Sequence, residues 1–211
     1  VSPSAHYMMG GVTTDLNGAT TLPGLFAAGE VACSGGHGAN RVASNSLVEG
    51  LVFGMRAGVA AIASAARGSI SSMIEVREPL PRGHGDRLED VEKVRNSLRR
   101  IMWGQVGLIR SRESLVRATA QLARWERMVS RSFSSRADLE VKNMVQVARC
   151  VAEGALWREN SVGAHYRSDF PGTRRPGWKT HSRLRLTDRT TERVGLRPRG
   201  KLVSWRTPKT G

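Results

Sequence analysis

Residues 34–41 combine three glycines with a terminal arginine, a pattern that suits the binding of an anion. The guanidinium of Arg41 presents a planar fork of donors that matches a carboxylate or a phosphate. The glycines allow positive φ angles and a close approach of the backbone to a ligand. A glycine-rich loop can equally be a flexible connection, so glycine content alone is a weak signal.

Glu30 is a second candidate ligand contact. The apolar run of residues 25–28 follows the Pro23-Gly24 turn and is predicted to be a buried strand. Ligands of open α/β sheets bind beyond the carboxyl ends of strands, which is where Glu30 would lie. A solvated turn glutamate is an equally good interpretation, because loop carboxylates are usually exposed. By residue type alone, His6 is also more often structural than functional.

A helix is predicted to follow the glycine-rich loop. Ser44 or Asn45 can cap it, and Ser46 with Glu49 has the spacing of a capping box. A helix N-terminus carries unpaired N–H groups and about half a positive charge, which would stabilise an anion. Apolar residues recur at helical spacing as far as residue 62, but Glu49 and Arg56 interrupt them. We therefore expect no membrane-spanning run and favour close packing against a sheet.

The remainder of the chain divides into a linker, a helical region and a basic tail. Glycine, serine and proline break the periodicity over residues 68–87. Three amphipathic patterns between residues 88 and 160 predict an antiparallel three-helix bundle. From residue 173 onward, only Asp188 and Glu192 oppose the 12 Lys and Arg residues of the tail, which carries most of the net charge of +15. The tail is predicted to be disordered, and a nucleic-acid-binding fragment is one non-enzymatic alternative.

The cysteines and the missing motifs limit the possible compartment and domain content of the protein. Cys33 and Cys150 are far apart and outside any CxxC pattern, which predicts a reducing compartment without a disulfide framework. We find no signal peptide and no metal-ligand cluster. No GxGxxG fingerprint has the required strand before it and helix after it, and the chain begins with Val1. We therefore expect the C-terminal part of a larger protein.

Four strings in order carry a specific resemblance: HYMMGGV (6–12), GLFAAGE (24–30), HGANRVASNSL (37–47) and SVGAHYRSDFP (161–171). They resemble the flavoprotein family of fumarate reductases, succinate dehydrogenases and L-aspartate oxidases. The form ASNSL is more similar to the L-aspartate oxidase branch, because the respiratory members more often have GANSL. The helical strings MWGQVGLIRS and KNMVQVARC also resemble that branch.

The resemblance implies an α/β fragment of an FAD-binding domain, an α-helical three-helix bundle domain and a basic tail. Its implied boundaries are residues 1–12 for the end of a substrate-capping domain, 13–67 for the C-terminal part of the FAD-binding domain, 68–87 for the linker, 88–160 for the bundle, 161–172 for a return segment and 173–211 for the tail. The tail does not resemble the family. Val162 stands where the family usually has arginine, and we expect His165 and Arg167 to be structural bridges.

The resemblance also implies which residues form the site. His6 and Arg41 match the positions that bind a substrate carboxylate. Glu30 matches a contact to the ribityl or ribose region of FAD, and Ser46 and Leu47 match backbone contacts to its isoalloxazine ring. The general-base arginine of the family belongs to the capping domain and is expected upstream, so no catalytic residue is expected in this chain.

The implied reaction is the oxidation of L-aspartate to iminoaspartate, with FAD as hydride acceptor, in cytoplasmic de novo NAD biosynthesis. Quinolinate synthase is then a candidate partner for hand-off of the product, and no membrane partner is expected. A portion of a fumarate reductase or succinate dehydrogenase flavoprotein is the alternative. The isolated chain is expected to be inactive, because it lacks the pyrophosphate loop and the catalytic arginine.

Overall fold

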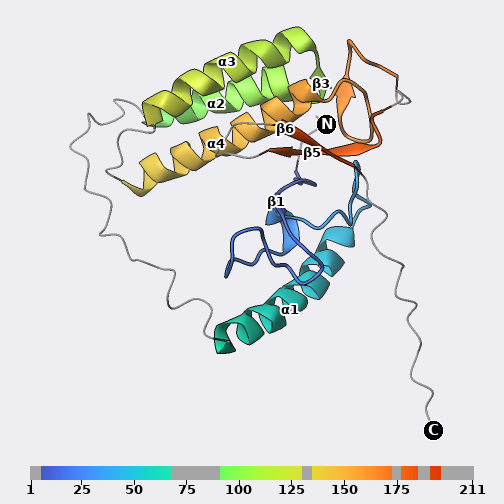
Figure 1. Cartoon of the computed structure of the whole chain (residues 1–211). Helices are drawn as coiled ribbons and strands as arrows, with labels where there is room; N and C mark the ends of the chain where they lie inside the picture. The colour runs from blue at the N-terminus through green and yellow to red at the C-terminus, as the bar shows by residue number, and fades with distance from the viewer. Residues whose placement is uncertain (1–5, 68–90, 130–134, 173–176, 185–190, 196–211) are drawn as a thin grey trace. The chain divides into compact units, whose positions relative to one another are not determined.

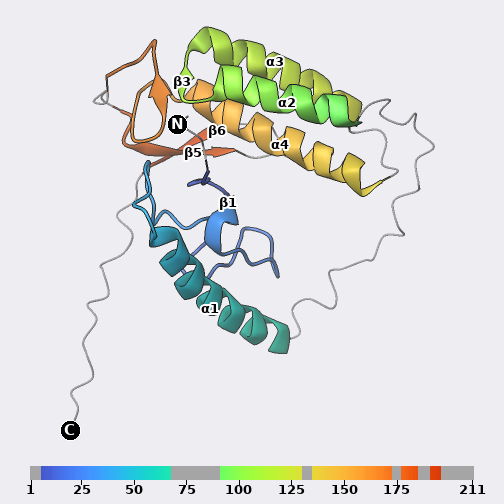
Figure 2. The ribbon, with the colours of Figure 1, turned by 180° about the vertical axis from the view of Figure 1, so that it is seen from behind.

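The computed structural model describes residues 6–67, 91–129, 135–172, 177–184 and 191–195. These residues contain four α-helices and three two-stranded sheets, shown from opposite sides in Figures 1 and 2. They divide into two compact units. Unit 1 takes residues 6–67, 135–138 and 162–166 of the described chain, and unit 2 takes the rest. The predicted linker, residues 68–87, lies outside the described residues.

Unit 1 begins with a small parallel sheet whose strands flank a tight turn. The two strands are β1 (Val12–Thr13) and β2 (Ala32–Cys33). After β1, the Asp15 carboxylate accepts hydrogen bonds from the backbone N–H groups of Asn17 and Ala19, at 2.8 and 2.9 Å. An aspartate that bonds the backbone two residues on is typical of a tight turn.

The apolar run of residues 25–28 is not the buried strand that its composition predicts. Within it only Phe26 forms a β-bridge, to the turn that follows β1. Gly24 and Gly29 have φ angles of +82° and +74° and redirect the chain on both sides of the run. None of the four residues between them is buried, and Leu25 is 48% exposed. The 3-10 turn η1 (Gly29–Val31) then leads into β2.

The predicted long helix of unit 1 is confirmed as α1 (Asn45–Ala66). It follows Ser44, whose φ of +67° is left-handed, and no side chain caps its first turn. The predicted capping box is wrong, because the side chain of Glu49 is directed into the interior of unit 1 and the residue is only 8% exposed. The turn packs closely on the helix: a Cβ at Gly18 would lie 2.6 Å from the Cβ of Ala57.

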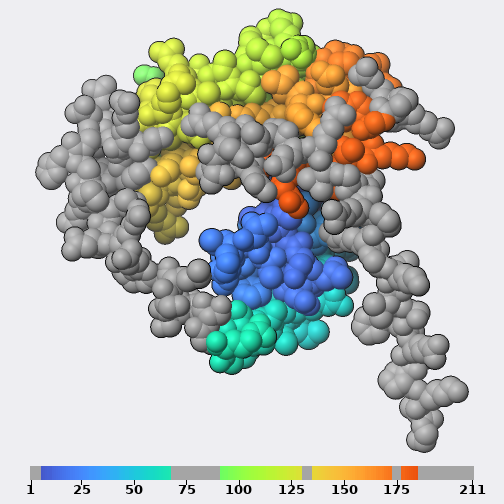
Figure 3. All heavy atoms as spheres, in the orientation of Figure 1, coloured from blue at the N-terminus to red at the C-terminus, as the bar shows by residue number. Residues whose placement is uncertain are grey.

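One face of α1 is apolar and open to solvent. It exposes 66–76% of each of Leu47, Leu51, Met55, Val59 and Ile62. Beside it, a groove of about 690 Å³ runs between the helix and residues 15–26, which lie against each other in Figure 3. Among the described residues, α1 alone is long and apolar enough to cross a membrane, with a mean hydropathy of 1.5, so the expectation of no such run is wrong. A single helix of this kind is a weak indication of a membrane span, because core helices of soluble proteins pass the same test.

Unit 2 contains α2 (Val91–Val106), α3 (Arg112–Val129) and, from Leu139 onward, α4 (Arg136–Trp157), which confirms the three predicted helices. Both ribbon views show them side by side (Figures 1 and 2). Residues three or four apart supply the buried stripes, as expected for amphipathic helices. The stripe of α3 and that of α4 are 9% exposed or less at Leu115, Ala118, Leu122, Trp125, Val129, Val141, Val145, Ala148, Ala152 and Ala155. Met128, on the same helix α3, is 49% exposed.

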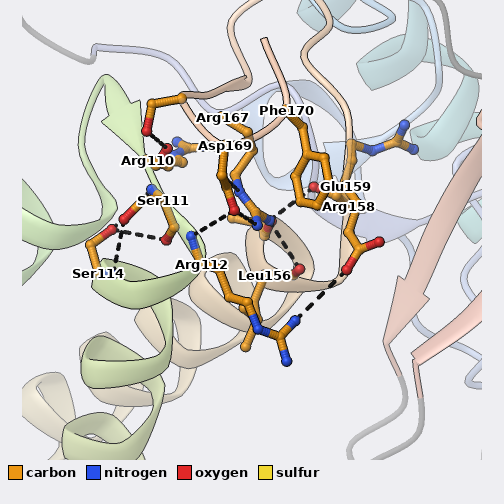
Figure 4. Close-up of polar contacts among 12 residues, drawn as sticks. Arg110, Ser111, Arg112, Ser114, Leu156, Arg158, Glu159, Arg167, Asp169 and Phe170 are labelled. Atoms are coloured by element: carbon orange, nitrogen blue, oxygen red, sulfur yellow. Dashed lines mark hydrogen bonds and ion pairs between the residues drawn. The ribbon is translucent and has the colours of Figure 1, made fainter. Parts of the chain in front are cut away.

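A fully buried arginine closes the C-terminal end of α4 (Figure 4). Nη1 of Arg167 donates to the carbonyl oxygens of Ala155, Leu156 and Arg158 at 3.0–3.1 Å. Nε and Nη2 donate to the two carboxylate oxygens of Asp169 at 2.8 and 2.7 Å. The last carbonyls of a helix lack intrahelical partners, so Arg167 satisfies groups that would otherwise be buried without hydrogen bonds. These contacts give Arg167 a structural role within unit 2.

Two short stretches of the basic tail belong to the described residues. They contain β5 (Thr180–Leu184) and β6 (Thr191–Gly195), which pair in antiparallel fashion. Trp178, just before β5, meets Trp157 of α4 edge-on with ring centres 5.1 Å apart. Arg158 donates to the carbonyl of Trp178 at 3.5 Å. These contacts have no periodic signature in the sequence. The other tail residues lie outside the described chain, so the predicted disorder of the tail stays a prediction.

Candidate functional site

Two residues 35 positions apart in the chain meet near the N-terminal end of α1. Nη2 of Arg41 lies 2.9 Å from Nε2 of His6, and Nη1 lies 3.3 Å from the hydroxyl of Ser46. A guanidinium only donates, so Nε2 of His6 accepts in this arrangement, and the neutral ring keeps its proton on Nδ1. The structure therefore brings together three of the five residues predicted for the site.

Arg41 forms no ion pair with a carboxylate of the described chain. Its guanidinium carbon lies 4.3 Å from the centre of the Tyr7 ring, and its remaining contact is a 3.4 Å hydrogen bond to the carbonyl of Val42. An aromatic face attracts a cation without neutralising it. Arg41 therefore keeps its full charge and a planar fork of donors for an incoming carboxylate.

A buried carboxylate lies on the other side of Tyr7. The side chain of Glu49 is 6% exposed, and its Oε2 accepts from the Tyr7 hydroxyl at 3.2 Å and from Nε2 of His37 at 2.6 Å. Its Oε1 accepts from the hydroxyl of Ser34. An ionised carboxylate only accepts, so Nε2 of His37 carries a proton. Three donors thus satisfy the buried carboxylate, which is the condition for burying a charge.

The surroundings of Tyr7 keep its phenol protonated. Burial raises the pKa of Tyr7 above its ordinary value of 10.0, and the Glu49 carboxylate raises it further through its charge and its hydrogen bond. The positive charge of Arg41 acts in the opposite direction but is the smallest of these effects. Tyr7 therefore remains a hydrogen-bond donor to Glu49 across the physiological pH range.

The other two predicted residues lie outside this cluster. Oε1 of Glu30 accepts from the backbone N–H of Met8 at 3.0 Å, which ties the segment after His6 to η1. The backbone N–H of Leu47 donates to the carbonyl of Ser44 at 3.1 Å, and the Leu47 side chain is 73% exposed. Within the described chain, neither residue forms a hydrogen bond with the histidine–arginine pair.

The backbone around β1 suits contact with a large planar group. A Cβ at Gly10 would meet no atom within 4 Å, whereas a Cβ at Gly11 would lie 2.2 Å from the carbonyl oxygen of Val31. The backbone is therefore open at Gly10 and tightly packed against Val31 at Gly11. The N-terminus of α1 adds first-turn N–H groups that would donate to a negatively charged edge. These residues fit one side of a flat, partly anionic cofactor such as a flavin.

A distant segment of unit 1 packs onto the glycine-rich loop. In Val162–Tyr166, the backbone N–H of Ala164 donates to the carbonyl of Ala39 at 2.9 Å. Gly163 has a φ of +55°, and a Cβ there would lie 2.1 Å from the same carbonyl oxygen. Only glycine permits both the left-handed φ and this close approach. The contact holds the loop two residues before Arg41.

Sequence reasoning missed Tyr7, His37 and Glu49. Glu49 is a carboxylate within an otherwise apolar helix, and this was the available signal, but its spacing from Ser46 suggested a capping box instead. His37 was treated only as part of the glycine-rich loop. Nothing in the sequence indicated that the ring of Tyr7 lies between the carboxylate and Arg41.

The described residues contain no group of three or more His, Cys, Asp and Glu side chains that could hold a metal ion. Cys33 and Cys150 are both free thiols. Burial raises the pKa of the Cys150 thiol, and the neighbouring Glu153 carboxylate raises it further.

Comparisons with known proteins agree on one family. The model of the FAD binding domain matches residues 1–47, and that of the fumarate reductase flavoprotein C-terminal region matches residues 95–200, which includes part of the tail thought to be unrelated. The fumarate reductase flavoprotein subunit of Mycobacterium tuberculosis is 40% identical over 94% of this chain and 38% of its own length. The L-aspartate oxidase of Streptomyces coelicolor is 40% identical over 90% of this chain and 35% of its own length. Escherichia coli quinol fumarate reductase superposes with a TM-score of 0.74 at 30% identity, over 92% of this chain and 37% of that one. The chain thus spans little more than a third of the length of these relatives.

Proposed function

Because the chain belongs to the FAD-binding flavoprotein family of fumarate reductases, succinate dehydrogenases and L-aspartate oxidases, we propose that it is the C-terminal portion of an FAD-dependent oxidoreductase acting on a four-carbon dicarboxylate. The observation that carries this proposal is the His6–Arg41 pair. Its 2.9 Å contact combines a neutral imidazole with a guanidinium that forms no ion pair in the described chain. Such a pair is suited to a carboxylate group of the substrate.

In the proposed complex, Arg41 donates two parallel hydrogen bonds to one carboxylate of the substrate, and His6, the other proposed carboxylate ligand, lies beside Arg41. Fixing the carboxylate in this way would orient the substrate carbon that is oxidised and reduce the entropy lost on reaching the transition state. Ser46 supports Arg41 through its hydroxyl at 3.3 Å. The general base is not among these residues.

FAD, when bound, would supply the two-electron acceptor for this oxidation. Its flavin end would lie against the bare backbone at Gly10, and the first turn of α1, including Ser46 and Leu47, would face its negatively charged edge. Glu30, which also holds the backbone N–H of Met8, is the proposed contact to the ribityl or ribose region.

We further propose L-aspartate as the substrate and iminoaspartate as the product. Ser44 in the ASNSL string and the relatives named L-aspartate oxidase, at 40% and 36% identity, support this choice. The equally similar fumarate reductase flavoprotein subunit of M. tuberculosis supports the alternative, interconversion of succinate and fumarate. One assay separates the two substrates.

The test uses the natural full-length protein, purified with FAD and given an excess of an artificial electron acceptor. Oxidation of L-aspartate would release oxaloacetate and ammonia, because the imine product hydrolyses in water. Formation of both from L-aspartate supports the oxidase. Fumarate formed only from succinate supports the alternative, and turnover of neither dicarboxylate would refute the proposed function. Arg41→Lys, which keeps the charge but not the fork, should reduce kcat/KM for the true substrate about 10- to 100-fold.

A further inference from the structure

We propose that Glu49 and Tyr7 are positioning residues for substrate binding: the buried carboxylate fixes the tyrosine, and the tyrosine ring fixes the orientation of Arg41. This inference rests on the proposed function, because it assumes that Arg41 binds a carboxylate of the substrate. It assigns a role to two side chains that neither the sequence pattern nor the expected site includes.

The first step is the anchoring of Glu49. Its side chain is 6% exposed and accepts hydrogen bonds from Tyr7 and from two residues of the glycine-rich loop, Ser34 and His37. A carboxylate held by three donors has little freedom to rotate. It projects from the second turn of α1, the most regular element of the unit, so it forms a rigid reference point.

The second step is the anchoring of the Tyr7 ring. Its hydroxyl donates to Glu49 at 3.2 Å, and its ring meets the His37 ring edge to face, with the ring centres 5.3 Å apart and the planes at 88°. The hydroxyl bond fixes one end of the side chain, and the edge contact fixes its rotation. Tyr7 is only half-buried, so these two contacts, more than general packing, determine where its face points.

The third step is the placement of Arg41 on that face. The guanidinium carbon lies 4.3 Å from the ring centre, within the range of a cation–π contact. The long side chain of an arginine loses much rotational freedom when its fork is held in one plane. The Tyr7 face supplies this restraint without a competing negative charge, and so the fork stays aligned with His6 and available to the substrate.

The negative charge of Glu49 allows a direct electrostatic effect on binding to be distinguished from an effect through Tyr7. A negative charge near Arg41 repels an anionic substrate, so if Glu49 acted only through its field, Glu49→Gln would strengthen dicarboxylate binding. If it acts through Tyr7, the same substitution frees the tyrosine and weakens binding. The two roles therefore predict opposite changes in the dissociation constant.

The experiment measures malonate binding to the FAD-loaded full-length protein by isothermal titration calorimetry. Malonate is a dicarboxylate without the adjacent pair of oxidisable carbons, so it binds without turnover. We expect Tyr7→Leu to raise the Kd about 3- to 30-fold, the range of a lost cation–π contact, and Glu49→Gln to raise it by a smaller factor. Tyr7→Phe, which keeps the ring but loses the hydroxyl, should resemble Glu49→Gln.

The double variant tests whether Glu49 acts on malonate binding through Tyr7. Because Glu49 acts through Tyr7, Tyr7→Leu combined with Glu49→Gln should bind malonate no more weakly than Tyr7→Leu alone. Tyr166→Leu, at the only other tyrosine and 42% exposed, is the matched control and should leave the Kd unchanged. Melting temperature and FAD content of each variant identify any loss that comes from misfolding.

Three outcomes would overturn the inference. These are tighter malonate binding in Glu49→Gln, additive losses in the double variant, and an unchanged Kd in Tyr7→Leu. Each leaves the proposed function standing if the unsubstituted protein binds malonate. Absence of malonate binding to the unsubstituted protein would instead overturn the proposed function itself, and with it the inference.

Discussion

Replacing Asp169 by asparagine should destabilise the helical unit without any effect on the candidate site. Asp169 accepts two hydrogen bonds from the fully buried Arg167, at 2.8 and 2.7 Å, and one from the backbone N–H of Arg112 at 3.0 Å. Asparagine has the same shape but presents an NH₂ group where a carboxylate oxygen stood. The guanidinium would then be buried with only carbonyl oxygens as partners (Figure 4).

The expected loss of unfolding free energy follows from the pKa of Asp169. The hydrogen bonds from Arg167, opposed by a smaller effect of burial, lower the pKa of Asp169 from 3.8 to about 2. At about 1.36 kcal/mol per pKa unit, this difference corresponds to roughly 2.4 kcal/mol. The Asp169 side chain is 29% exposed, so solvent screening reduces the expected loss of unfolding free energy to about 1–2 kcal/mol at neutral pH. Breaking a completely buried ion pair would cost about 3–5 kcal/mol.

The pH dependence has a defined sign. The folded pKa of Asp169 lies below its unfolded value, so the stabilisation is complete above pH 3.8 and disappears as the pH falls toward 2. About half of the difference between Asp169 and Asp169→Asn should be gone by about pH 3, because that pH lies midway between the two pKa values.

The measurement is urea unfolding, followed by circular dichroism and tryptophan fluorescence, at neutral pH and at several acidic pH values. The control is Glu113→Gln, which removes an ion pair with Arg117 whose side chains are 79% and 57% exposed, and it should cost less than about 0.5 kcal/mol. Equal losses in the two variants, or a loss in Asp169→Asn that persists unchanged near pH 2, would refute the reasoning.

Three further predictions concern separate parts of the chain. Gly163→Ala places a Cβ 2.1 Å from the Ala39 carbonyl oxygen at a φ of +55°, which should displace residues 162–166 from the glycine-rich loop. Trypsin should then cleave after Arg41 faster than in the unsubstituted protein. Equal cleavage rates would contradict the proposal that this contact holds the loop. Trp178→Leu removes the edge contact with α4, and amide hydrogen exchange in β5 should accelerate about 2- to 10-fold, whereas unchanged exchange would show that the contact is not stabilising. Leu51→Lys, at a residue 76% exposed on the apolar face of α1, should lower binding of a hydrophobic dye to the 211-residue chain. It should change the free energy of unfolding by less than about 0.5 kcal/mol. Unchanged dye binding would show that the dye binds to a surface other than the apolar face of α1.

Local patterns in the sequence were sufficient to predict the helices. The repeat of apolar residues three and four apart predicts α1 and the buried stripes of α3 and α4, because that period is set by the geometry of a single helix. The turn at Asp15 was equally predictable, since a side chain that bonds the backbone two residues on needs no distant partner. The resemblance to the flavoprotein family likewise came from short strings whose order needs no structure.

Local patterns failed where a distant partner decides the conformation. Glu49 has the spacing of a capping residue, yet three donors from other segments draw its carboxylate into the interior. Residues 25–28 have the composition of a buried strand, yet they lie between positive φ angles at Gly24 and Gly29 and none of them is buried. Nothing periodic in the sequence indicated that Trp178 contacts Trp157 of α4.

The amino-acid sequence by itself determined the helices, the family resemblance and the chemical types in the site, because propensity, period and residue chemistry are local properties. Only the tertiary structure placed His6 beside Arg41, laid the guanidinium on the Tyr7 ring and buried Glu49 behind it. Each of those contacts joins segments at least 12 residues apart, and in each the geometry depends on how the intervening chain folds. The role of Tyr7 and Glu49 therefore became visible only when all four side chains were seen together.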